Sequence, residues 1–468
     1  FFYAPSNPLN MTDMKAPERA KVLSSATSIK RRQFLKSSAF IGTGLLLPRF
    51  KLFGADAPSN KLNIALIATG HRAKDHFSVM SKENVVAICD INEEHLASAA
   101  KLFPRAKRYI DWRKCLEQKD IDAIVCCTLD HTHAFVTNWA MNRGKHVYCE
   151  KPLVNSVAEA RVIRQTWLKN KHKLATQVGT QRHQNANFNR VRELIRDGAI
   201  GELQAVNAWG DRKVPRDGYL PAQDPPPYIH YDLWLGPSPF HPYNSEYFKG
   251  GCLHWNMYWD WGCGQVGDMG SHTMDLAWNA IDAGLPTSAE GKGDPINPDV
   301  TPVKLRTEFE LPANHWRPPI TVAWHQGGAM PDSPHRAVDL TKIDHGVMFE
   351  GTRGYLIADF TTHLLIPQKN APGEDADMTY YKPRSKRKLI PSMGVFQQEW
   401  INACKGDLKT SCNFGYATDM IEMMLLGLVA YRVGKKIKYD GATGQVTDCP
   451  EASEYLSHKY REGWTLNG

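Results

Sequence analysis

Hydrophobic and polar positions follow two different patterns along the chain after its first 57 residues. In the first of these regions, continuous apolar runs of four to six residues alternate with polar stretches long enough for helices. Such runs are typical of parallel strands that are buried on both faces and joined by helical crossovers. They lie at residues 62–67, 85–89, 123–127 and 146–149. The pattern predicts a doubly wound α/β domain over residues 58–180.

The second region has shorter strand-like stretches separated by loops rich in proline and glycine. They lie at residues 203–209, 303–310, 320–324, 346–350 and 355–359. Residues 413–432 carry apolar side chains at helical spacing, and we expect this helix to pack back on the first domain. We therefore assign residues 181–440 to a second, α+β domain and residues 441–468 to a C-terminal tail.

Composition agrees with a folded protein of two domains. The chain has 468 residues, of which 42% are hydrophobic and 23% charged, which excludes disorder, collagen and a multi-span membrane protein. Residues 1–57 hold nine Lys or Arg and three Asp or Glu, so they carry +6 of the net charge of +8 and leave +2 for the rest. This balance gives no electrostatic sign of a nucleic-acid partner. Ten cysteines without a CxxC pair exclude a disulfide scaffold, a zinc ribbon and thioredoxin chemistry.

The first 57 residues resemble a twin-arginine signal peptide. Arg31 and Arg32 stand in a basic stretch, residues 37–47 are uncharged, and small residues follow at positions 55–57. The apolar run is about half of the ~20 residues that a membrane span needs. The resemblance implies export to the periplasm by the twin-arginine translocase in the folded state, usually with a cofactor already bound.

A glycine turn follows the first apolar run. The dinucleotide-binding fingerprint G-x-G-x-x-G/A has its three positions occupied here by Ala68, Gly70 and Ala73. Asp90 ends the second run, twenty residues beyond Gly70, where a carboxylate can accept hydrogen bonds from the adenosine ribose and repel a 2′-phosphate. The turn and acid predict NAD in preference to NADP. Asp90 could also serve as the N-cap of a helix over residues 92–103, and both roles can coexist.

The third and fourth apolar runs open onto polar segments, Thr128 to His133 and Glu150-Lys151-Pro152. Ligands of open α/β sheets bind at the carboxyl ends of such strands. With the segment Gly267 to Asp275, which contains the pattern G-D-x-x-x-H, these residues closely resemble the Gfo/Idh/MocA family over residues 61–439. Two positions depart from the family pattern: Ala68 replaces a glycine and Leu129 replaces a proline.

The resemblance implies a fold, an activity and a set of site residues. The second domain should contain an open, mainly antiparallel sheet, and the protein should form a homodimer or homotetramer. Lys151, Asp268 and His272 match the family's catalytic positions. The cofactor-binding positions implied are Ala68, Thr69, Gly70, His71, Arg72, Asp90, Thr128, His131, His133, Glu150 and Lys151.

Asp268 and His272 are four residues apart, so on a helix they would lie on one face. An imidazole beside a carboxylate can take a proton from a substrate hydroxyl near neutral pH. We expect Lys151 on the opposite side, orienting the same hydroxyl and stabilising an alkoxide. Asp268, His272 and Asp275 could alternatively hold a metal, but no further strong ligand is placed by spacing, and we predict no metal site.

An aromatic segment lies between the two halves of the chain. Four large aromatic residues fall within positions 255–261, interleaved with Asn and Asp, and others precede them at positions 228–234. This composition suits a sugar ring, whose C–H faces stack on aromatic rings, and it equally suits a packed core or subunit interface. We take Trp234, Trp255, Tyr258, Trp259 and Asp275 as candidate substrate-binding residues.

Three functions are compatible with these residues. The leading hypothesis is an exported NAD-dependent oxidoreductase acting on a secondary hydroxyl, or the corresponding ketone, of a carbohydrate or polyol. The first alternative is an NAD-dependent glycosidase, which transiently oxidises a sugar, eliminates the leaving group and recycles the bound NAD. The second is a non-catalytic sugar-binding protein on a degenerate scaffold.

Overall fold

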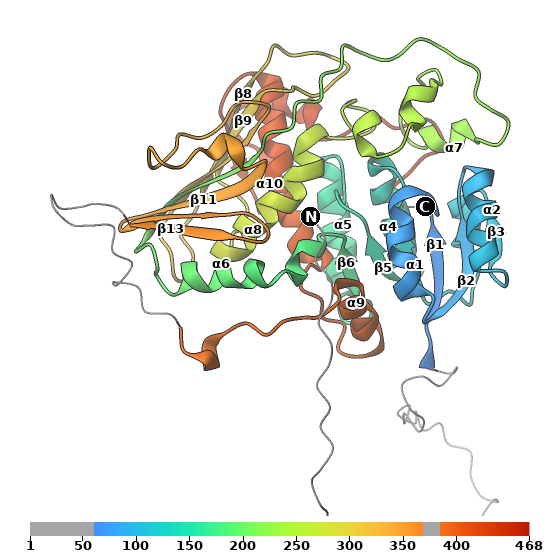
Figure 1. The fold of residues 1–468 in the computed structure, drawn as a ribbon. Coiled ribbons are helices and arrows are strands. Elements are labelled where there is room, and N and C mark those ends of the chain that lie inside the picture. Colours follow the sequence, from blue (N-terminus) through green and yellow to red (C-terminus); the bar gives the residue numbers. More distant parts are fainter. Residues whose placement is uncertain (1–59, 368–383, 468) are drawn as a thin grey trace, which may run out of the picture. The chain divides into compact units, whose positions relative to one another are not determined.

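The structure is a computed structural model that describes residues 60–367 and 384–467, so the predicted signal peptide lies outside the described residues. The first sheet is a six-stranded parallel sheet in the order β3-β2-β1-β4-β5-β6 (Figure 1). Its strands are β1 (Asn63–Ile67), β2 (Asn84–Cys89), β3 (Lys107–Tyr109), β4 (Ala123–Cys126), β5 (His146–Cys149) and β6 (Thr176–Val178). The four longest correspond to the apolar runs, because each is covered on both faces.

Five helices connect these strands. They are α1 (Lys74–Met80), α2 (Glu93–Leu102), α3 (Trp112–Cys115), α4 (Asp130–Asn142) and α5 (Val157–Asn170). Three of them begin with a side chain that accepts hydrogen bonds from the first turn, supplied by Asn92, Asp111 and Ser156. The N-cap of the helix that follows β2 is therefore Asn92 and not Asp90, which was the alternative role considered for that residue.

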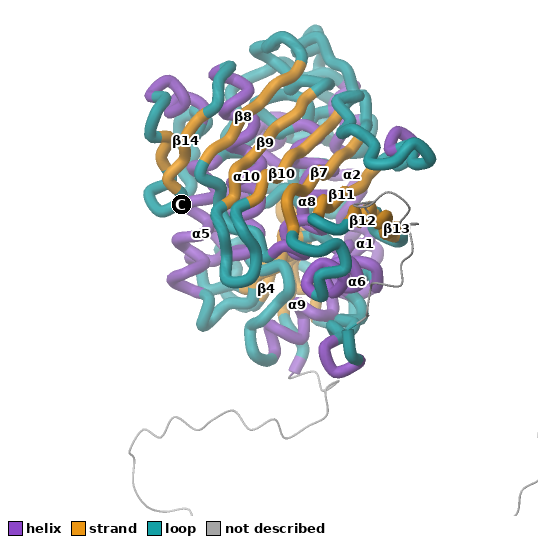
Figure 2. Tube along the Cα trace, turned by 90° about the vertical axis from the view of Figure 1, so that its left-hand side faces the viewer, coloured by secondary structure: helices purple, strands orange, loops and turns teal. Residues whose placement is uncertain are grey.

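The second sheet has nine strands in the order β13-β12-β11-β7-β10-β9-β8-β14-β15 (Figure 2). Among these strands β10 and β7 pair in parallel and the other pairs are antiparallel. This arrangement confirms the predicted fold class. The strands are β7 (Leu203–Gly210), β8 (Ser288–Gly293), β9 (Leu305–Leu311), β10 (Ile320–Gln326), β11 (His345–Gly351), β12 (Gly354–Ala358), β13 (His363–Pro367), β14 (Ile437–Asp440) and β15 (Gln445–Val446).

The second region has five α-helices among the described residues. They are α6 (Ala186–Arg196), α7 (Tyr231–Leu235), α8 (Ser271–Ile281), α9 (Phe396–Lys405) and α10 (Phe414–Val433). Two of them, α8 and α10, pack on the second sheet. Helix α10 contacts α5 on one side and β8 and β9 on the other, which explains why it is apolar around most of its circumference (Figure 1). Helix α8 lies against β7 and β11.

Residues 211–262, between β7 and α8, form a long excursion that we name the cover segment. It reaches the first domain, where the amide of His230 donates to the carbonyl of Ile91 at 2.9 Å and Ile229 forms a β-bridge with Asn92. The C-terminal residues reach the same region, since Arg461 pairs with Asp232 at 2.6 Å. The cover segment is therefore bound both to the first domain and to the C-terminal residues.

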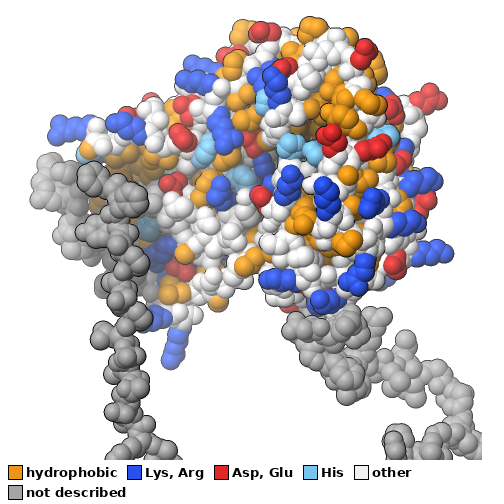
Figure 3. Space-filling view, turned by 45° about the vertical axis from the view of Figure 1, so that its right-hand side comes forward, with side chains coloured by type: hydrophobic (Ala, Val, Ile, Leu, Met, Phe, Trp, Pro, Cys, Tyr) orange, Lys and Arg blue, Asp and Glu red, His pale blue; other side chains and the backbone are white. Residues whose placement is uncertain are grey.

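No helix in the part of the chain that the structure describes combines the length and apolarity needed to cross a membrane. On the face drawn in Figure 3, Lys and Arg side chains are interspersed with acidic and neutral ones.

Candidate functional site

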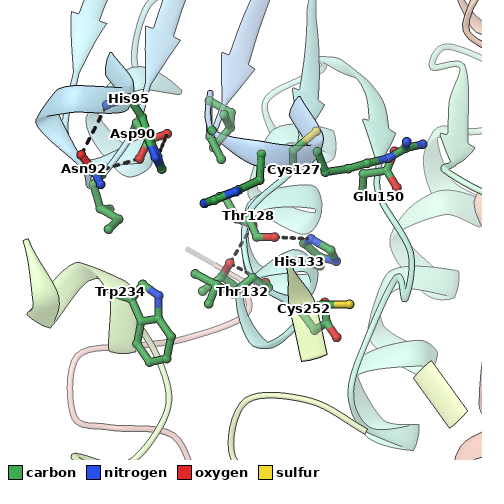
Figure 4. Close-up of a pocket in the computed structure, with 18 of the residues that line it drawn as sticks. Asp90, Asn92, His95, Cys127, Thr128, Thr132, His133, Glu150, Trp234 and Cys252 are labelled. Carbon is green, nitrogen blue, oxygen red and sulfur yellow. Dashed lines mark hydrogen bonds and ion pairs between the residues drawn. The ribbon is translucent and has the colours of Figure 1, made fainter. Parts of the chain in front are cut away.

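A cavity of about 550 Å³ lies at the carboxyl ends of β1, β2, β4 and β5, under the cover segment (Figure 4). Twelve of the residues predicted from the sequence line it. They are Ala68, Gly70, His71, Arg72, Asp90, Thr128, His133, Glu150, Lys151, Trp234, Trp255 and His272. We name the part around Ala68, Gly70 and Asp90 the turn end, and the part around Lys151 and His272 the lysine end.

The glycine turn is built by close packing. Ala68 has a φ of 70°, in the left-handed region where glycine is usual, so this alanine adopts the conformation for which the fingerprint prefers glycine. At Gly70, an added Cβ would lie only 2.3 Å from Nδ1 of His95, a residue of α2. A side chain at position 70 would therefore have to displace the ring of His95.

Asp90 braces this turn. Its Oδ2 accepts hydrogen bonds from the amide of Thr69 at 2.8 Å and from its hydroxyl at 3.0 Å, and its Oδ1 accepts from the amide of Asn92 at 2.9 Å. Thr69 itself is buried and is not among the lining residues. The carboxylate of Asp90 therefore lies on the cavity wall in a fixed position.

Glu150 fixes a second part of the wall. Its Oε1 lies 2.8 Å from Nε2 of His76 and 3.2 Å from Nε of Arg72. Burial would raise the pKa of Glu150, but His76 and Arg72 outweigh it and lower that pKa to about 2. The carboxylate is thus ionised at all ordinary pH values and holds Arg72 at the cavity.

The segment after β4 supplies Thr128 and His133 to the cavity, whereas His131 points away from it. Nε2 of His131 lies 3.0 Å from the carbonyl of Trp234, so this histidine fastens the cover segment to α4. The ring nitrogens of His133 lie 2.7 Å from the carbonyl of Pro152 and 3.1 Å from that of Thr128 (Figure 4). His131 is a positioning residue in this arrangement.

One cluster of residue types could suit a metal in the described part of the chain. The ligand atoms of Cys126, His133 and Cys149 lie within 4.8 Å of one another and are buried. Both nitrogens of His133 face carbonyl oxygens, however, so the imidazole is already committed. Asp275, a candidate in the sequence analysis, is also committed, since it accepts from Tyr416 at 2.5 Å and contacts His183 at 2.7 Å.

At the lysine end, Lys151 forms an ion pair with Oδ1 of Asp268, whose Oδ2 accepts from Arg212 at 2.9 Å. Asp268 lies in a single π-helical turn, Val266–Gly270, that precedes α8. Burial would lower the pKa of Lys151, but Asp268 outweighs it and holds that pKa above its usual value. Lys151 is therefore cationic and held in one place.

His272 does not pair with Asp268, which corrects the expectation from their spacing. The π-helical turn changes the register, and the carboxylate is taken by Lys151 and Arg212 instead. Burial, followed by the charge of Lys151, lowers the pKa of His272 to about 3. Its Nδ1 has no hydrogen-bond partner among the described residues. His272 is thus a neutral imidazole on the wall beside a fixed ammonium group.

The aromatic candidates divide into two groups. Trp234 and Trp255 line the cavity, whereas Tyr258 and Trp259 do not. Tyr258 is fully buried among aromatic rings of the cover segment, and the indole of Trp259 donates to the carbonyl of Asn297 and packs against Arg432. Composition could not separate these groups, because both roles use the same residue types.

Other lining residues were not singled out by the sequence. Asp130 is buried, and burial raises its pKa to about 7, within reach of the charge of Lys151. Cys252 joins the lysine end from the cover segment, and Gln181 joins from the turn after β6 (Figure 4 shows Cys252). Asp130 stood within the motif Thr128 to His133 and could have been found there, whereas no local signal marks Cys252.

Two consecutive parts of the chain match profiles of one family. Residues 62–179 match the Gfo/Idh/MocA profile described as oxidoreductase family, NAD-binding Rossmann fold. Residues 204–299 match the profile described as oxidoreductase family, C-terminal alpha/beta domain.

Relatives and solved structures agree with this match. An inositol 2-dehydrogenase of Klebsiella pneumoniae (strain 342) is 34% identical over 146 residues, 30% of this chain and 43% of that protein. One of Salmonella typhimurium is 27% identical over 151 residues, 31% of this chain and 45% of that protein. The chain thus spans less than half the length of these curated relatives.

Among solved structures, the WlbA dehydrogenase of Bordetella pertussis in complex with NADH and UDP-GlcNAcA has a TM-score of 0.56 at 17% identity. The match covers 81% of this chain and 99% of that one, and at this identity it establishes the fold alone. Together with the motif residues gathered at the cavity, the two profile matches show that residues 62–179 are similar to the NAD-binding Rossmann domain of Gfo/Idh/MocA oxidoreductases and residues 204–299 to their C-terminal alpha/beta domain.

Proposed function

We propose that the protein is an exported NAD-dependent oxidoreductase that oxidises a secondary hydroxyl of a carbohydrate or polyol, or reduces the corresponding ketone. One observation carries the proposal. Lys151 and His272 line one end of a cavity whose other end is formed by the glycine turn and Asp90. A single ligand that spans the cavity from Asp90 would therefore end beside a fixed cation and a neutral imidazole.

The residues of the turn end fit a dinucleotide. Asp90 is fixed on the wall by Thr69 and Asn92, which leaves its outer lone pairs for ribose hydroxyls, and its charge disfavours a 2′-phosphate. Gly70 and Arg72 line the adjacent wall, where the pyrophosphate is expected. NAD, when bound, supplies the acceptor for the hydride that leaves the substrate carbon.

Lys151 orients the substrate hydroxyl and stabilises its oxygen. Its ammonium group is held by Asp268 and its side chain is only 15% exposed, so the charge is poorly solvated and its electrostatic effect is strong. Because Asp268 is itself fixed by Arg212, the lysine needs no rearrangement during the reaction. Negative charge that develops on the substrate oxygen is thus met by a preorganised cation.

His272 receives the hydroxyl proton in this proposal. With a pKa of about 3, the imidazole is unprotonated at neutral pH, the form that accepts a proton. A pKa this low makes the imidazole a weak base, so it accepts the proton only because Lys151 stabilises the alkoxide that forms, and the imidazolium then releases the proton to solvent. The pair thus combines a permanent cation with a transient proton carrier.

The decisive experiment incubates the purified protein with a panel of sugars, polyols and aryl glycosides, with and without added NAD. NADH that accumulates in proportion to oxidised product supports the proposal. Release of the aglycone without net NADH would instead identify the redox-neutral glycosidase. Binding of a sugar with neither product would identify a non-catalytic sugar-binding protein and contradict the proposal.

The glycosidase alternative has one structural observation in its favour. The cover segment contacts α2 through His230 and Glu93 at 2.8 Å, and Trp234 closes the cavity beside it. Such a cover would slow the exchange of NAD, and a resident cofactor suits a reaction without net redox change. Denaturing protein purified without added NAD, and measuring the dinucleotide released, tests this point: empty sites would remove the support for the alternative.

Export and self-association complete the proposal. The twin-arginine pattern at Arg31 and Arg32 predicts translocation of the folded, NAD-loaded protein to the periplasm. Fractionating cells that express the full chain and its Arg31→Lys/Arg32→Lys variant tests this, since the variant should remain in the cytoplasm.

We further propose a homodimer or homotetramer, and light scattering that shows only monomer would contradict it.

A further inference from the structure

The lysine end contains more positive than negative charge. Lys151 and Arg212 share the single carboxylate of Asp268. A further guanidinium, that of Arg182, has no carboxylate partner in residues 60–367 and 384–467, and its Nε is buried without a hydrogen-bond partner. The positive charge of Arg182 is thus not balanced by a carboxylate within the described chain.

Arg182 lies next to the cavity wall. It is not itself among the lining residues, but it follows Gln181, which is, and its guanidinium carbon lies 4.8 Å from the centre of the Phe360 ring. The ring of His272 meets the same Phe360 edge-on, with centroids 6.3 Å apart. The charge of Arg182 is also one of the influences that lower the pKa of His272. Arg182 and His272 therefore flank one aromatic ring.

The surroundings of Arg182 disfavour the charged form of its guanidinium group. Burial and the positive charge of Arg72 both lower its pKa. Proteins rarely leave a half-buried guanidinium without an anion, because desolvation is then uncompensated. Two other groups at this end also lack partners among the described residues, Oε1 of Gln181 and Nδ1 of His272. Three unpartnered polar groups at one end indicate a ligand that supplies both charge and hydrogen bonds.

We propose that the substrate is an anionic sugar or polyol whose carboxylate or phosphate binds Arg182 while the hydroxyl to be oxidised faces Lys151 and His272. This inference rests on the proposed oxidoreductase function and names its substrate class. The planar fork of a guanidinium suits bidentate binding of either anion. The phosphates of the cofactor are expected at the turn end, so they leave Arg182 for the substrate.

Binding measured by calorimetry tests the proposal without requiring turnover. The NAD-loaded full chain is titrated with matched acidic and neutral compounds: D-glucuronate and D-glucose, D-galacturonate and D-galactose, D-gluconate and D-sorbitol, and D-glucose 6-phosphate. At least one acid should bind ten or more times more tightly than its neutral partner. The arms with carboxylates and with the phosphate ester show which anion is preferred.

Variants then locate the effect. Arg182→Gln should weaken binding of the preferred acid at least tenfold and leave NAD binding within twofold, and Arg182→Lys should retain part of the preference. Arg190→Gln removes a charge from α6 that is paired with Glu193 and does not contact the Phe360 ring shared by Arg182 and His272, and it should change nothing.

Equal binding of acids and neutral compounds, no binding of any acid, or a preference that survives in Arg182→Gln would overturn the inference. Failure of the proposed function would be seen separately, as acid binding without NADH formation.

Discussion

The turn end and the lysine end of the cavity treat buried polar groups differently. At the turn end, Asp90 accepts three hydrogen bonds from Thr69 and Asn92. At the lysine end, the carboxylate of Asp268 is shared by two cations, and Nδ1 of His272 has no partner in the described residues. Groups satisfied within the chain keep their geometry with or without a ligand. Groups that have no partner in the chain can form hydrogen bonds or ion pairs only with a bound ligand or with solvent.

This difference teaches how the two ends divide their tasks. The turn end is built in advance for a ligand that is always the same, the dinucleotide. Under the proposed function, the substrate completes the lysine end, so the residues there would determine which substrate is accepted and how fast it reacts. Substitutions at the two ends should therefore change different measurements.

The largest effect is expected for Lys151→Ala. Without the fixed cation, turnover should fall by about 10²–10⁴, the usual contribution of a positioned group in proton transfer and charge stabilisation. NAD affinity should stay within about threefold, because Asp268 keeps Arg212 as a partner. Rates of NADH formation with the best substrate, and NAD binding by fluorescence, measure both. Lys74→Ala, on α1 outside the cavity lining, is the control, and turnover near the wild-type rate would contradict the role.

A smaller effect, on cofactor binding, is expected for Asp90→Ala. The variant loses both the ribose contact and the brace of the turn, so NAD should bind about 10- to 100-fold more weakly. NADP should suffer less, because the repulsion of its 2′-phosphate disappears, and the preference for NAD should shrink. Glu94→Ala removes an exposed carboxylate from α2 as a control. An unchanged ratio of the two dissociation constants would exclude Asp90 from the ribose site.

Trp255 and Trp259 are a matched pair of residues that tests which aromatic side chains contact the substrate. Trp255→Ala should raise KM for the substrate by about tenfold, since a ring that stacks on the sugar is lost. Trp259→Ala should leave KM unchanged and lower the melting temperature, because this ring packs away from the cavity. Steady-state kinetics and thermal unfolding of both variants decide. Equal changes of KM in the two variants would contradict the assignment of Trp255, and not Trp259, to the lining of the cavity.

The smallest effect concerns stability and comes from Asp130. Burial raises its pKa from the ordinary 3.8 to about 7, so between these pH values the unfolded chain has lost a proton that the folded chain keeps. The free energy of unfolding contributed by this group therefore falls as pH rises through that window.

Asp130→Asn should abolish this fall. Relative to the wild type, it should gain on the order of 2 kcal/mol between pH 4 and pH 7.5. Urea unfolding at the two pH values measures the gain. A stability difference that is the same at both would show that Asp130 is ionised in the folded protein.

Four of the six strands of the first sheet were predicted from local sequence, and only the three-residue strands β3 and β6 were missed. The run at residues 146–149 coincides with β5, and the other long strands differ from their predicted ranges by a single residue at an end. The reason is physical: a strand covered on both faces must be continuously apolar, and the signal is local. Glu150 and Lys151 were recognised for the same reason, because a parallel strand delivers the residues after it to one edge of the sheet.

The second domain was predicted less completely from the sequence. Strands β8, β13, β14 and β15 were not predicted. Strand β8 is rich in small and polar residues, β13 is an exposed edge strand, and β14 and β15 are short. The spacing of Asp268 and His272 predicted a helical pair, but one π-helical turn redirected the carboxylate to Lys151. A single extra residue in a turn leaves no mark on residue types.

Tertiary structure alone decided which distant residues complete the site. Sequence separation gave no sign that Arg212 would pair with Asp268, that Cys252 would join the cavity, or that Trp255 would line it while Trp259 would not. These contacts arise because residues 211–262 fold back over the first domain. The sequence determined the chemistry that follows each strand, since that depends on neighbours along the chain. Which charges are compensated depends on neighbours in space, and only the folded chain decides them.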